Sequence, residues 1–356
     1  AGGGGPYWCG FIVMAPWQTW LNYGDRTLVD RHYPAMREWM GYVERYMKDG
    51  LLTRWPDTPY RDWFLGDWLA PHGVDTGSEA SVSLVNNCFV SDCYARMAQM
   101  ARLTGHDDEA AAFEARHEAL NRTIHARFYD PATHTYATGS QLDMTYPMLV
   151  GATPDSLRAG VEQRLFRSTH DVMKDHIGGG LVGVPIITRW AVRSHNPEFI
   201  YRMLKQRGYP GYLHMIDHGA TATWEYWSGE RSRVHNCYNG IGTWFYQALG
   251  GLRTDSSHPG YEHVFIDPQI PEGVEWCRIG KETPYGRIDL GWKIADGELR
   301  IDVTLPPGVT ATAITPAGAC RGRLDGRRLA PQSPGTKIAS GRHRLVFGLA
   351  PQNEGQ

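Results

Sequence analysis

The sequence predicts a mainly α-helical domain followed by a small antiparallel β-sandwich. Before residue 253, apolar residues recur at helical spacings, and connections rich in glycine and aromatic residues separate the helices. After residue 253, short stretches of alternating apolar residues lie between proline and glycine turns. We therefore expect residues 1–253 to form an α/α toroid or solenoid of helical hairpins, with the connecting loops on one face. Residues 254–356 should form the sandwich.

The helical pattern is clearest in the first half of the chain. Residues 25–46 carry apolar side chains on one face, and Pro34 predicts a break into two helices because proline lacks an N–H group. Residues 86–104 and 107–127 form a second pair, in which Gly105 ends the first helix. Further helices are expected at residues 153–167, 183–193, 197–206 and 240–249.

The C-terminal part has the pattern of a sandwich of about 100 residues, an ordinary size for such a module. Strands are expected at residues 263–267, 288–294, 299–305 and 342–347. Asp296-Gly297 lies between two of them and is a strong hairpin signal. No residue in this part is a candidate catalytic group.

Composition excludes several classes of protein. The formal net charge of −2 over 356 residues gives no reason to expect a nucleic acid or an anionic membrane as partner. The chain contains no membrane-spanning apolar run and no leader sequence. The sequence begins at Ala1 and not at a methionine, so a leader removed earlier or lying outside this sequence stays an option. The compartment is therefore left open. The six cysteines form no CxxC pair, which argues against a zinc site and favours free thiols.

The most informative motif is Trp224-Glu225-Tyr226-Trp227, with small residues before it and Gly229 after it. It places one carboxylate among three aromatic rings, and the chain holds 13 tryptophans and 18 tyrosines. Aromatic rings suit the apolar C–H faces of sugars, although a large aromatic core would also use many of them. The structural alternative for Glu225 is a buried helix start, where its carboxylate caps backbone N–H groups.

Other irregular connections hold residues that helix packing does not require, and such loops are where binding residues usually lie. For Asp67 the structural alternative is a turn or a helix cap, and for His235 it is a core hydrogen bond or a cap. Gly178-Gly179-Gly180 lacks a lysine at phosphate-binding spacing, so we interpret it as a flexible or tightly turning loop. The connections are residues 6–8, 66–71, 209–212 and 235–239.

These motifs resemble, in order and over nearly the whole chain, those of the bacterial α-L-rhamnosidases. The family consists of inverting glycoside hydrolases with an α/α six-hairpin barrel and a C-terminal β-sandwich. The motif around Glu225 is fairly specific to it. The segments that carry the resemblance are residues 6–8, 15–17, 23–25, 32–36, 66–71, 209–212, 219–227, 235–236 and 244–246.

The resemblance implies that Glu225 is the general base that activates water. Trp8 and Trp68 would line a rhamnose pocket, and Asp67 and His235 would hydrogen-bond the sugar hydroxyls or position the water. The remaining members of the expected substrate-binding set are Trp224 and Trp227. The implied partner is a rhamnose-containing glycoside, without metal or cofactor. A homo-oligomer is left open.

The sequence departs from the family pattern at two places. The segment of the type Asp-x-x-x-Glu-Arg that carries the family's general acid is absent, and Cys9-Gly10 stands where many relatives have Gly-Asp. We therefore expect an incomplete barrel that begins after its first hairpins. Two alternatives stay open: another α/α-barrel glycosidase or polysaccharide lyase, and a catalytically silent carbohydrate-binding protein.

Overall fold

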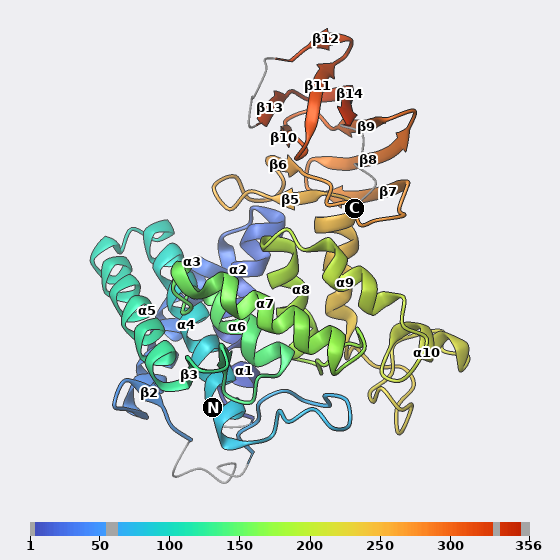
Figure 1. The fold of residues 1–356 in the computed structure, drawn as a ribbon. Coiled ribbons are helices and arrows are strands. Elements are labelled where there is room, and N and C mark those ends of the chain that lie inside the picture. Colours follow the sequence, from blue (N-terminus) through green and yellow to red (C-terminus); the bar gives the residue numbers. More distant parts are fainter. Residues whose placement is uncertain (1–3, 55–62, 330–334, 350–356) are drawn as a thin grey trace. The chain divides into compact units, whose positions relative to one another are not determined.

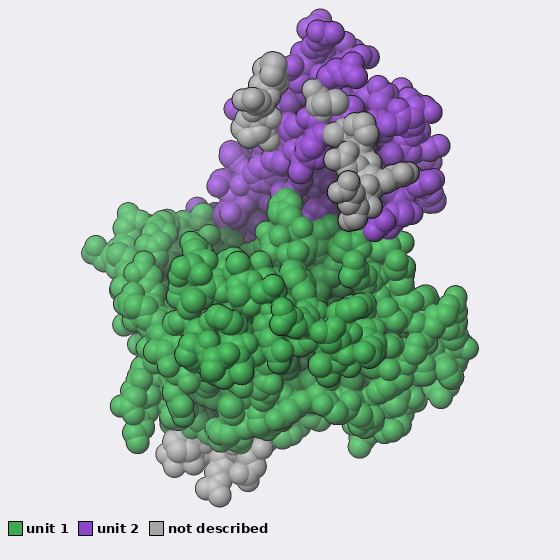
Figure 2. Space-filling view, viewed as in Figure 1, with its two compact units in different colours: residues 1–17, 27–241 green, residues 18–26, 242–356 purple. Residues whose placement is uncertain are grey.

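The computed structural model describes residues 4–54, 63–329 and 335–349. The chain divides into two compact units (Figure 2). Unit 1 comprises residues 1–17 and 27–241, and unit 2 comprises residues 18–26 and 242–356. Unit 1 is helical and unit 2 is built mainly from strands, which confirms the predicted change from helices to strands (Figure 1).

Unit 1 consists of helical hairpins in two layers. Helices α4, α6 and α8 pack against one another, and each is followed by a helix that packs on it from outside: α5, α7 and α9. Every residue of α6 is buried, as expected for an inner helix. The helices are α1 (Pro6–Cys9), α2 (Phe11–Tyr23), α3 (Thr27–Arg45), α4 (Glu79–Leu103), α5 (Asp107–Phe128), α6 (Gln141–Val150), α7 (Asp155–Asp171), α8 (Gly183–Arg193), α9 (Pro197–Leu204) and α10 (Tyr212–Asp217). Helix α2 begins in unit 1, and its residues from Gln18 onward belong to unit 2.

Local sequence signals explain several helix ends. The Ser78 hydroxyl accepts a hydrogen bond from the Ser81 N–H at the start of α4, seven residues before the predicted start at residue 86. Gly105 adopts a φ of +78° after α4, a conformation that glycine reaches without steric cost. Acidic residues then occupy the first turn of α5. Two short hairpins, β1 (Met47–Lys48) with β2 (Leu51–Leu52) and β3 (Tyr129–Asp130) with β4 (Thr135–Tyr136), complete unit 1.

Helix α3 corrects one prediction. The break expected at Pro34 does not occur, and α3 continues from Thr27 to Arg45 with the proline inside it. The proline removes one intrahelical hydrogen bond, at a cost of about 3 kcal/mol. The buried face, which includes Met36 and Trp39, extends beyond the proline. Burial of each large apolar side chain contributes about 1.5–3 kcal/mol, so packing outweighs the lost bond.

The segment that precedes the strands of unit 2 differs from its predicted secondary structure. The single helix expected over residues 240–249 is a succession of short helices: η1 (Asn239–Ile241), α11 (Gly242–Trp244) and the π-helix η2 (Phe245–Leu249). Within unit 2, the Leu249 carbonyl accepts a hydrogen bond of 2.7 Å from the Trp292 Nε1. The carbonyl of Leu21, which also belongs to unit 2, accepts a bond of 3.0 Å from the Gly260 N–H.

Unit 2 contains a four-stranded sheet, β13-β10-β6-β5, and a six-stranded sheet, β12-β11-β14-β9-β8-β7. All pairs in the six-stranded sheet are antiparallel, as predicted, whereas β6 and β10 run parallel. The strands are β5 (Leu252–Thr254), β6 (His263–Ile266), β7 (Trp276–Thr283), β8 (Gly286–Ala295), β9 (Glu298–Leu305), β10 (Thr310–Ile314), β11 (Ala319–Leu324), β12 (Arg327–Arg328), β13 (Gly335–Ile338) and β14 (Gly341–Leu349).

The predicted hairpin between β8 and β9 is confirmed. Ala295 pairs with Glu298, and the two turn residues Asp296 and Gly297 have φ values of 54° and 70°. Such a turn matches the twist of the flanking strands. Alternate residues of β8 and β9, among them Trp292, contribute to the apolar core of unit 2.

Several cysteines are buried free thiols, as the sequence predicts. Cys88, Cys93 and Cys237 are buried free thiols, and Cys277 is a half-buried one. Among the helices that the structure describes, none combines the length and apolarity required to cross a membrane.

We predict that Pro34→Ala raises the free energy of unfolding by about 1–3 kcal/mol, because it restores an N–H group inside α3. Urea unfolding would measure the change. Pro197→Ala is the matched control: Pro197 occupies the first turn of α9, where proline is tolerated, and its replacement should not stabilise the protein. Equal or lower stability of the Pro34 variant would contradict this account of α3.

Candidate active site

Glu225 lies in an irregular loop, residues 219–238, which we call the Glu225 loop. The structural alternative of a helix start is therefore wrong. The loop folds back on itself: the Glu225 N–H donates to the Ser232 carbonyl and the His235 N–H to the Thr223 carbonyl, each at 2.9 Å. The Glu225 residue is half-buried, and its Oε2 accepts one long hydrogen bond of 3.4 Å from the Ser232 N–H. Its Oε1 accepts none from the described residues, so the carboxylate keeps free acceptor capacity.

Asp67 belongs to a second loop, residues 66–71, which we call the Trp68 loop. Its Oδ2 accepts a hydrogen bond of 2.6 Å from the Gly180 N–H. Its Oδ1 accepts bonds of 2.8 Å and 2.9 Å from the N–H groups of Val182 and Gly183 at the start of α8. Three donors engage both carboxylate oxygens, so the structure favours the capping alternative over hydrogen bonding to a sugar. Burial raises the pKa of this carboxyl to about 6, although the three N–H groups lower it.

The three glycines at residues 178–180, which we call the glycine junction, are buried, so the flexible alternative of the predicted flexible or tightly turning loop does not apply. The Gly178 N–H donates to the Gln141 Oε1 at 2.7 Å, and the Gly179 carbonyl accepts from the Trp227 Nε1 at 3.0 Å. A Cβ atom at Gly180 would overlap the Trp68 carbonyl. The close approach of the Trp68 backbone therefore requires glycine at residue 180. Three successive glycines in the sequence do not by themselves reveal this requirement.

Tyr238 joins the two loops, and the sequence prediction missed this role. Its hydroxyl lies 2.9 Å from the Leu69 carbonyl and 3.0 Å from the Glu225 carbonyl. Leu69 and Tyr238 both have φ values in the left-handed region, 60° and 66°, which is uncommon outside glycine. Such conformations persist where surrounding contacts determine them, and they cluster at functional sites.

Trp224 and Trp227 support the Glu225 loop from inside. Each is only 2% exposed, so neither ring offers a free face to a sugar. This differs from the expectation that they bind substrate. Trp227 stacks on Tyr238 with ring centroids 3.9 Å apart. Trp224 packs against Gly229 and carries the Arg233 guanidinium over its ring at 5.1 Å.

Trp8 and Trp68 lie next to each other. Their ring centroids are 6.4 Å apart in an edge-to-face arrangement, and both residues are half-buried. The Leu65 N–H donates to the Gly4 carbonyl at 3.1 Å, which draws the segment before Trp8 against the segment before Trp68. Through Tyr238, the Trp68 loop is also joined to Glu225.

His235 is half-buried in the same loop as Glu225. Its Nδ1 accepts a hydrogen bond of 3.2 Å from the Cys237 N–H, which corresponds to the local structural alternative. A neutral imidazole whose Nδ1 accepts carries its proton on Nε2. No described residue accepts from that Nε2, so it keeps a donor for another partner.

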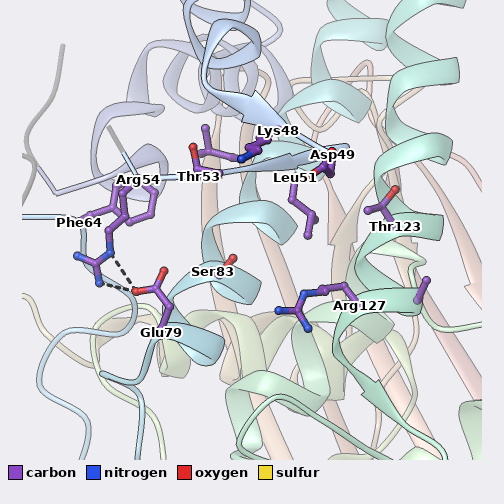
Figure 3. Close-up of a pocket in the computed structure, with 12 residues that line it drawn as sticks. Lys48, Asp49, Leu51, Thr53, Arg54, Phe64, Glu79, Ser83, Thr123 and Arg127 are labelled. Atoms are coloured by element: carbon purple, nitrogen blue, oxygen red, sulfur yellow. Dashed lines mark hydrogen bonds and ion pairs between the residues drawn. The ribbon is translucent and has the colours of Figure 1, made fainter. Parts of the chain in front are cut away.

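A cavity of about 490 Å³ in unit 1 contains none of these residues (Figure 3). It lies beside the β1–β2 hairpin, and its lining includes Lys48, Glu79 and Arg127. Glu79 forms an ion pair of 2.9 Å with Arg54. The cavity differs from the site around Glu225 in two respects: its Glu79 carboxylate is already paired with an arginine, and its lining holds few aromatic rings.

Family comparisons cover most of the chain. The model of the bacterial alpha-L-rhamnosidase 6 hairpin glycosidase domain matches residues 1–249, and that of the bacterial alpha-L-rhamnosidase C-terminal domain matches residues 251–327. These matches confirm the expected six-hairpin region and β-rich C-terminal domain.

Curated relatives are much longer than this chain. The alpha-L-rhamnosidase of Alteromonas sp. (strain LOR) is 24% identical over 328 residues, which cover 87% of this chain and 34% of that protein. The alpha-L-rhamnosidase of Streptomyces avermitilis is 25% identical over 328 residues, covering 89% and 30%. The chain thus spans about a third of the length of the relatives that it matches.

Solved structures share the fold. The alpha-L-rhamnosidase from Dictyoglumus thermophilum superposes with a TM-score of 0.86 at 17% identity, covering 97% of this chain and 40% of that one. The Streptomyces avermitilis alpha-L-rhamnosidase complexed with L-rhamnose gives 0.80 at 22% identity, covering 94% and 32%.

We predict that Gly180→Ala lowers the free energy of unfolding by about 3 kcal/mol or more, because its methyl group would overlap the Trp68 carbonyl. Chemical denaturation would measure the loss. Gly77→Ala is the matched control, since a Cβ atom there meets nothing within 4 Å. Similar losses in both variants would contradict the role of the glycine junction.

A second prediction concerns pH. The pKa of Asp67 is about 6 in the folded protein and about 3.9 in an unfolded chain. The folded state thus favours the protonated carboxyl: its contribution to stability is full below pH 3.9 and is lost as the pH rises through 6. Unfolding free energies should show a larger advantage of the wild type over Asp67→Asn at pH 4 than at pH 7, by about 2–3 kcal/mol.

The exposed turn residue Asp296 offers a control for the replacement of a carboxylate by an amide. Asp296→Asn should be about as stable as the wild type at pH 7, since Asn also suits its turn position. An advantage over Asp67→Asn that grows from pH 4 to pH 7 would refute the expected direction of the pH dependence.

Proposed function

The chain belongs to the bacterial α-L-rhamnosidase family of glycoside hydrolases, and from this premise we propose that it contributes to hydrolysis of terminal α-L-rhamnosyl groups with inversion. Glu225 is the proposed general base. The observation that carries the proposal is the half-buried Glu225 carboxylate with a free Oε1, on a loop that Tyr238 ties to the Trp68 loop.

The proposed chemistry follows the two-carboxyl scheme of inverting glycosidases. Glu225 takes a proton from a water molecule while the water oxygen attacks the anomeric carbon. The bond from that carbon to the glycosidic oxygen breaks on the opposite face, and an acid protonates the departing oxygen. The two carboxyl groups of such a pair stand about 6.5–9.5 Å apart to admit the water.

Trp8 and Trp68 are the proposed walls of the sugar pocket. Rhamnose is a 6-deoxy sugar, so its methyl group and C–H faces suit contact with aromatic rings. The His235 Nε2 is positioned in the Glu225 loop as a donor to a sugar hydroxyl or to the water. For Asp67 we propose an indirect role, because its carboxylate holds the Trp68 loop on the start of α8.

The general acid is assigned to no residue of this chain, since the Asp-x-x-x-Glu-Arg segment is absent from the sequence. That absence favours a second candidate function, binding of rhamnose without turnover. An aryl rhamnoside with a nitrophenolate leaving group separates the two, because such a group departs with little help from an acid. Turnover of p-nitrophenyl α-L-rhamnoside supports the hydrolase. Binding of L-rhamnose without turnover supports the second candidate, and absence of both contradicts both.

We predict that Glu225→Gln lowers kcat on this substrate by about 100- to 10,000-fold, because the amide cannot accept the proton of water. The dissociation constant for L-rhamnose, measured by calorimetry, should stay within a few fold. Glu230→Gln is the matched control: it removes the same charge from an exposed position of the same loop and should leave kcat unchanged. Full turnover by the Glu225 variant would exclude Glu225 as the base.

A further inference from the structure

The solvent-facing side of the six-stranded sheet in unit 2 is strongly cationic. Strands β7, β8, β9 and β14 border a shallow depression of about 820 Å³ on this side. Six cationic side chains line it against two carboxylates, whereas the whole chain has a net charge of −2. The cations are Arg278, Arg287, Lys293, Arg300, Arg342 and Arg344, and all are exposed.

The strand register arranges this face in rows that cross the sheet. One row runs from Gly280 through Asp289 and Thr304 to Arg342. The next row runs from Arg278 through Gly291 and Asp302 to Arg344, and a third from Trp276 through Lys293 and Arg300 to Val346. Neighbouring rows are two residues apart along the strands, about 7 Å. Every row therefore presents at least one cation.

Three of the cations have no ion-pair partner among the described residues. Arg287 binds Asp289 and Glu282, each at 2.8 Å, and Arg344 binds Asp302 at 2.6 Å. Arg300 binds Glu298 at 3.2 Å. The remaining three are distributed over three strands and keep their donors for a ligand: Arg278 on β7, Lys293 on β8 and Arg342 on β14.

The floor of the depression is low because two of its outward positions are glycines. A Cβ atom at Gly291 would stand 3.1 Å from the Arg278 Cγ, so this side chain lies along the sheet. The Arg287 guanidinium covers Gly280 in the same way. At the edge, Trp276 is 64% exposed on the same side as Arg278. The surface thus combines flat guanidinium groups with one free aromatic ring.

We propose that this face binds an acidic glycan, a chain of sugars that carries carboxylate groups. Free guanidinium groups bind carboxylates through paired hydrogen bonds, and an exposed tryptophan packs on sugar C–H faces. Asp289 and Asp302 lie in the middle of the rows, each paired with an arginine of the same face. They lower the positive charge available to a dense polyanion such as a nucleic acid, and their oxygens can accept hydrogen bonds from sugar hydroxyls. That the ligand is a glycan rests on the proposed function, whereas the binding of carboxylate groups follows from the charges of the face.

The test uses the full chain with polygalacturonate and with the same polymer fully methyl-esterified, which lacks the charge. Affinity electrophoresis or calorimetry should show at least about tenfold weaker binding of the ester. Binding of the acid form should weaken as salt rises from about 50 to about 300 mM. Equal binding of the two polymers would overturn the proposal, and so would tighter binding of single-stranded DNA than of polygalacturonate.

A triple variant, Arg278→Ala with Lys293→Ala and Arg342→Ala, should bind polygalacturonate at least about tenfold more weakly. The matched control removes three exposed arginines of unit 1, Arg31, Arg164 and Arg167, and should bind as the wild type does. Equal affinity of the triple variant and the wild type would overturn the proposal.

Turnover of p-nitrophenyl α-L-rhamnoside separates this inference from the proposed function. The triple variant should cleave this small neutral substrate as the wild type does. Turnover without polygalacturonate binding by the wild type would overturn the acidic-glycan site alone. Polygalacturonate binding without turnover or rhamnose binding would contradict the proposed function alone.

Discussion

The candidate active site depends on the contact between the Asp67 carboxylate and the backbone at the start of α8. The N–H groups at a helix start have no partner inside the helix, and the helix dipole favours negative charge there. Asp67 accepts from Val182 and Gly183 at this end and from Gly180 just before it. An irregular loop that carries Trp68 is thereby fixed to a regular helix, whose position is set by its buried face.

The aromatic residues around the site fall into two groups: some support the loops from inside, and others stay partly accessible. Trp227 and Tyr238 stack on each other, and their polar atoms bind backbone carbonyls of other segments. They stabilise two loops whose backbones contain left-handed residues. Trp8 and Trp68 are only half-buried, and a sugar-binding surface requires residues that stay partly accessible. The many aromatic residues of this chain therefore have two roles: some support loops, and others provide accessible surface.

The two units carry different recognition chemistry. In unit 1, an aromatic pair and one available carboxylate suit a neutral deoxy sugar. In unit 2, the sheet face concentrates cations that the net charge of −2 conceals, because acidic residues elsewhere compensate for them. A near-zero net charge thus excludes little about local binding surfaces. Alternation along the strands explains how such a face arises, since the opposite side chains, including Leu290 and Trp292, form the core.

Short-range signals determined much of this protein from its sequence alone. Helical periodicity located α8 at residues 183–193, turn chemistry located the β8–β9 hairpin, and the motif around Glu225 identified the family. Tertiary packing decided the rest. Asp67 meets partners 113 to 116 residues away, α3 continues through Pro34, and the cationic face requires the register of several strands. Periodicity and turn preferences act over a few residues, whereas burial and hydrogen-bond partners depend on which distant segments pack together.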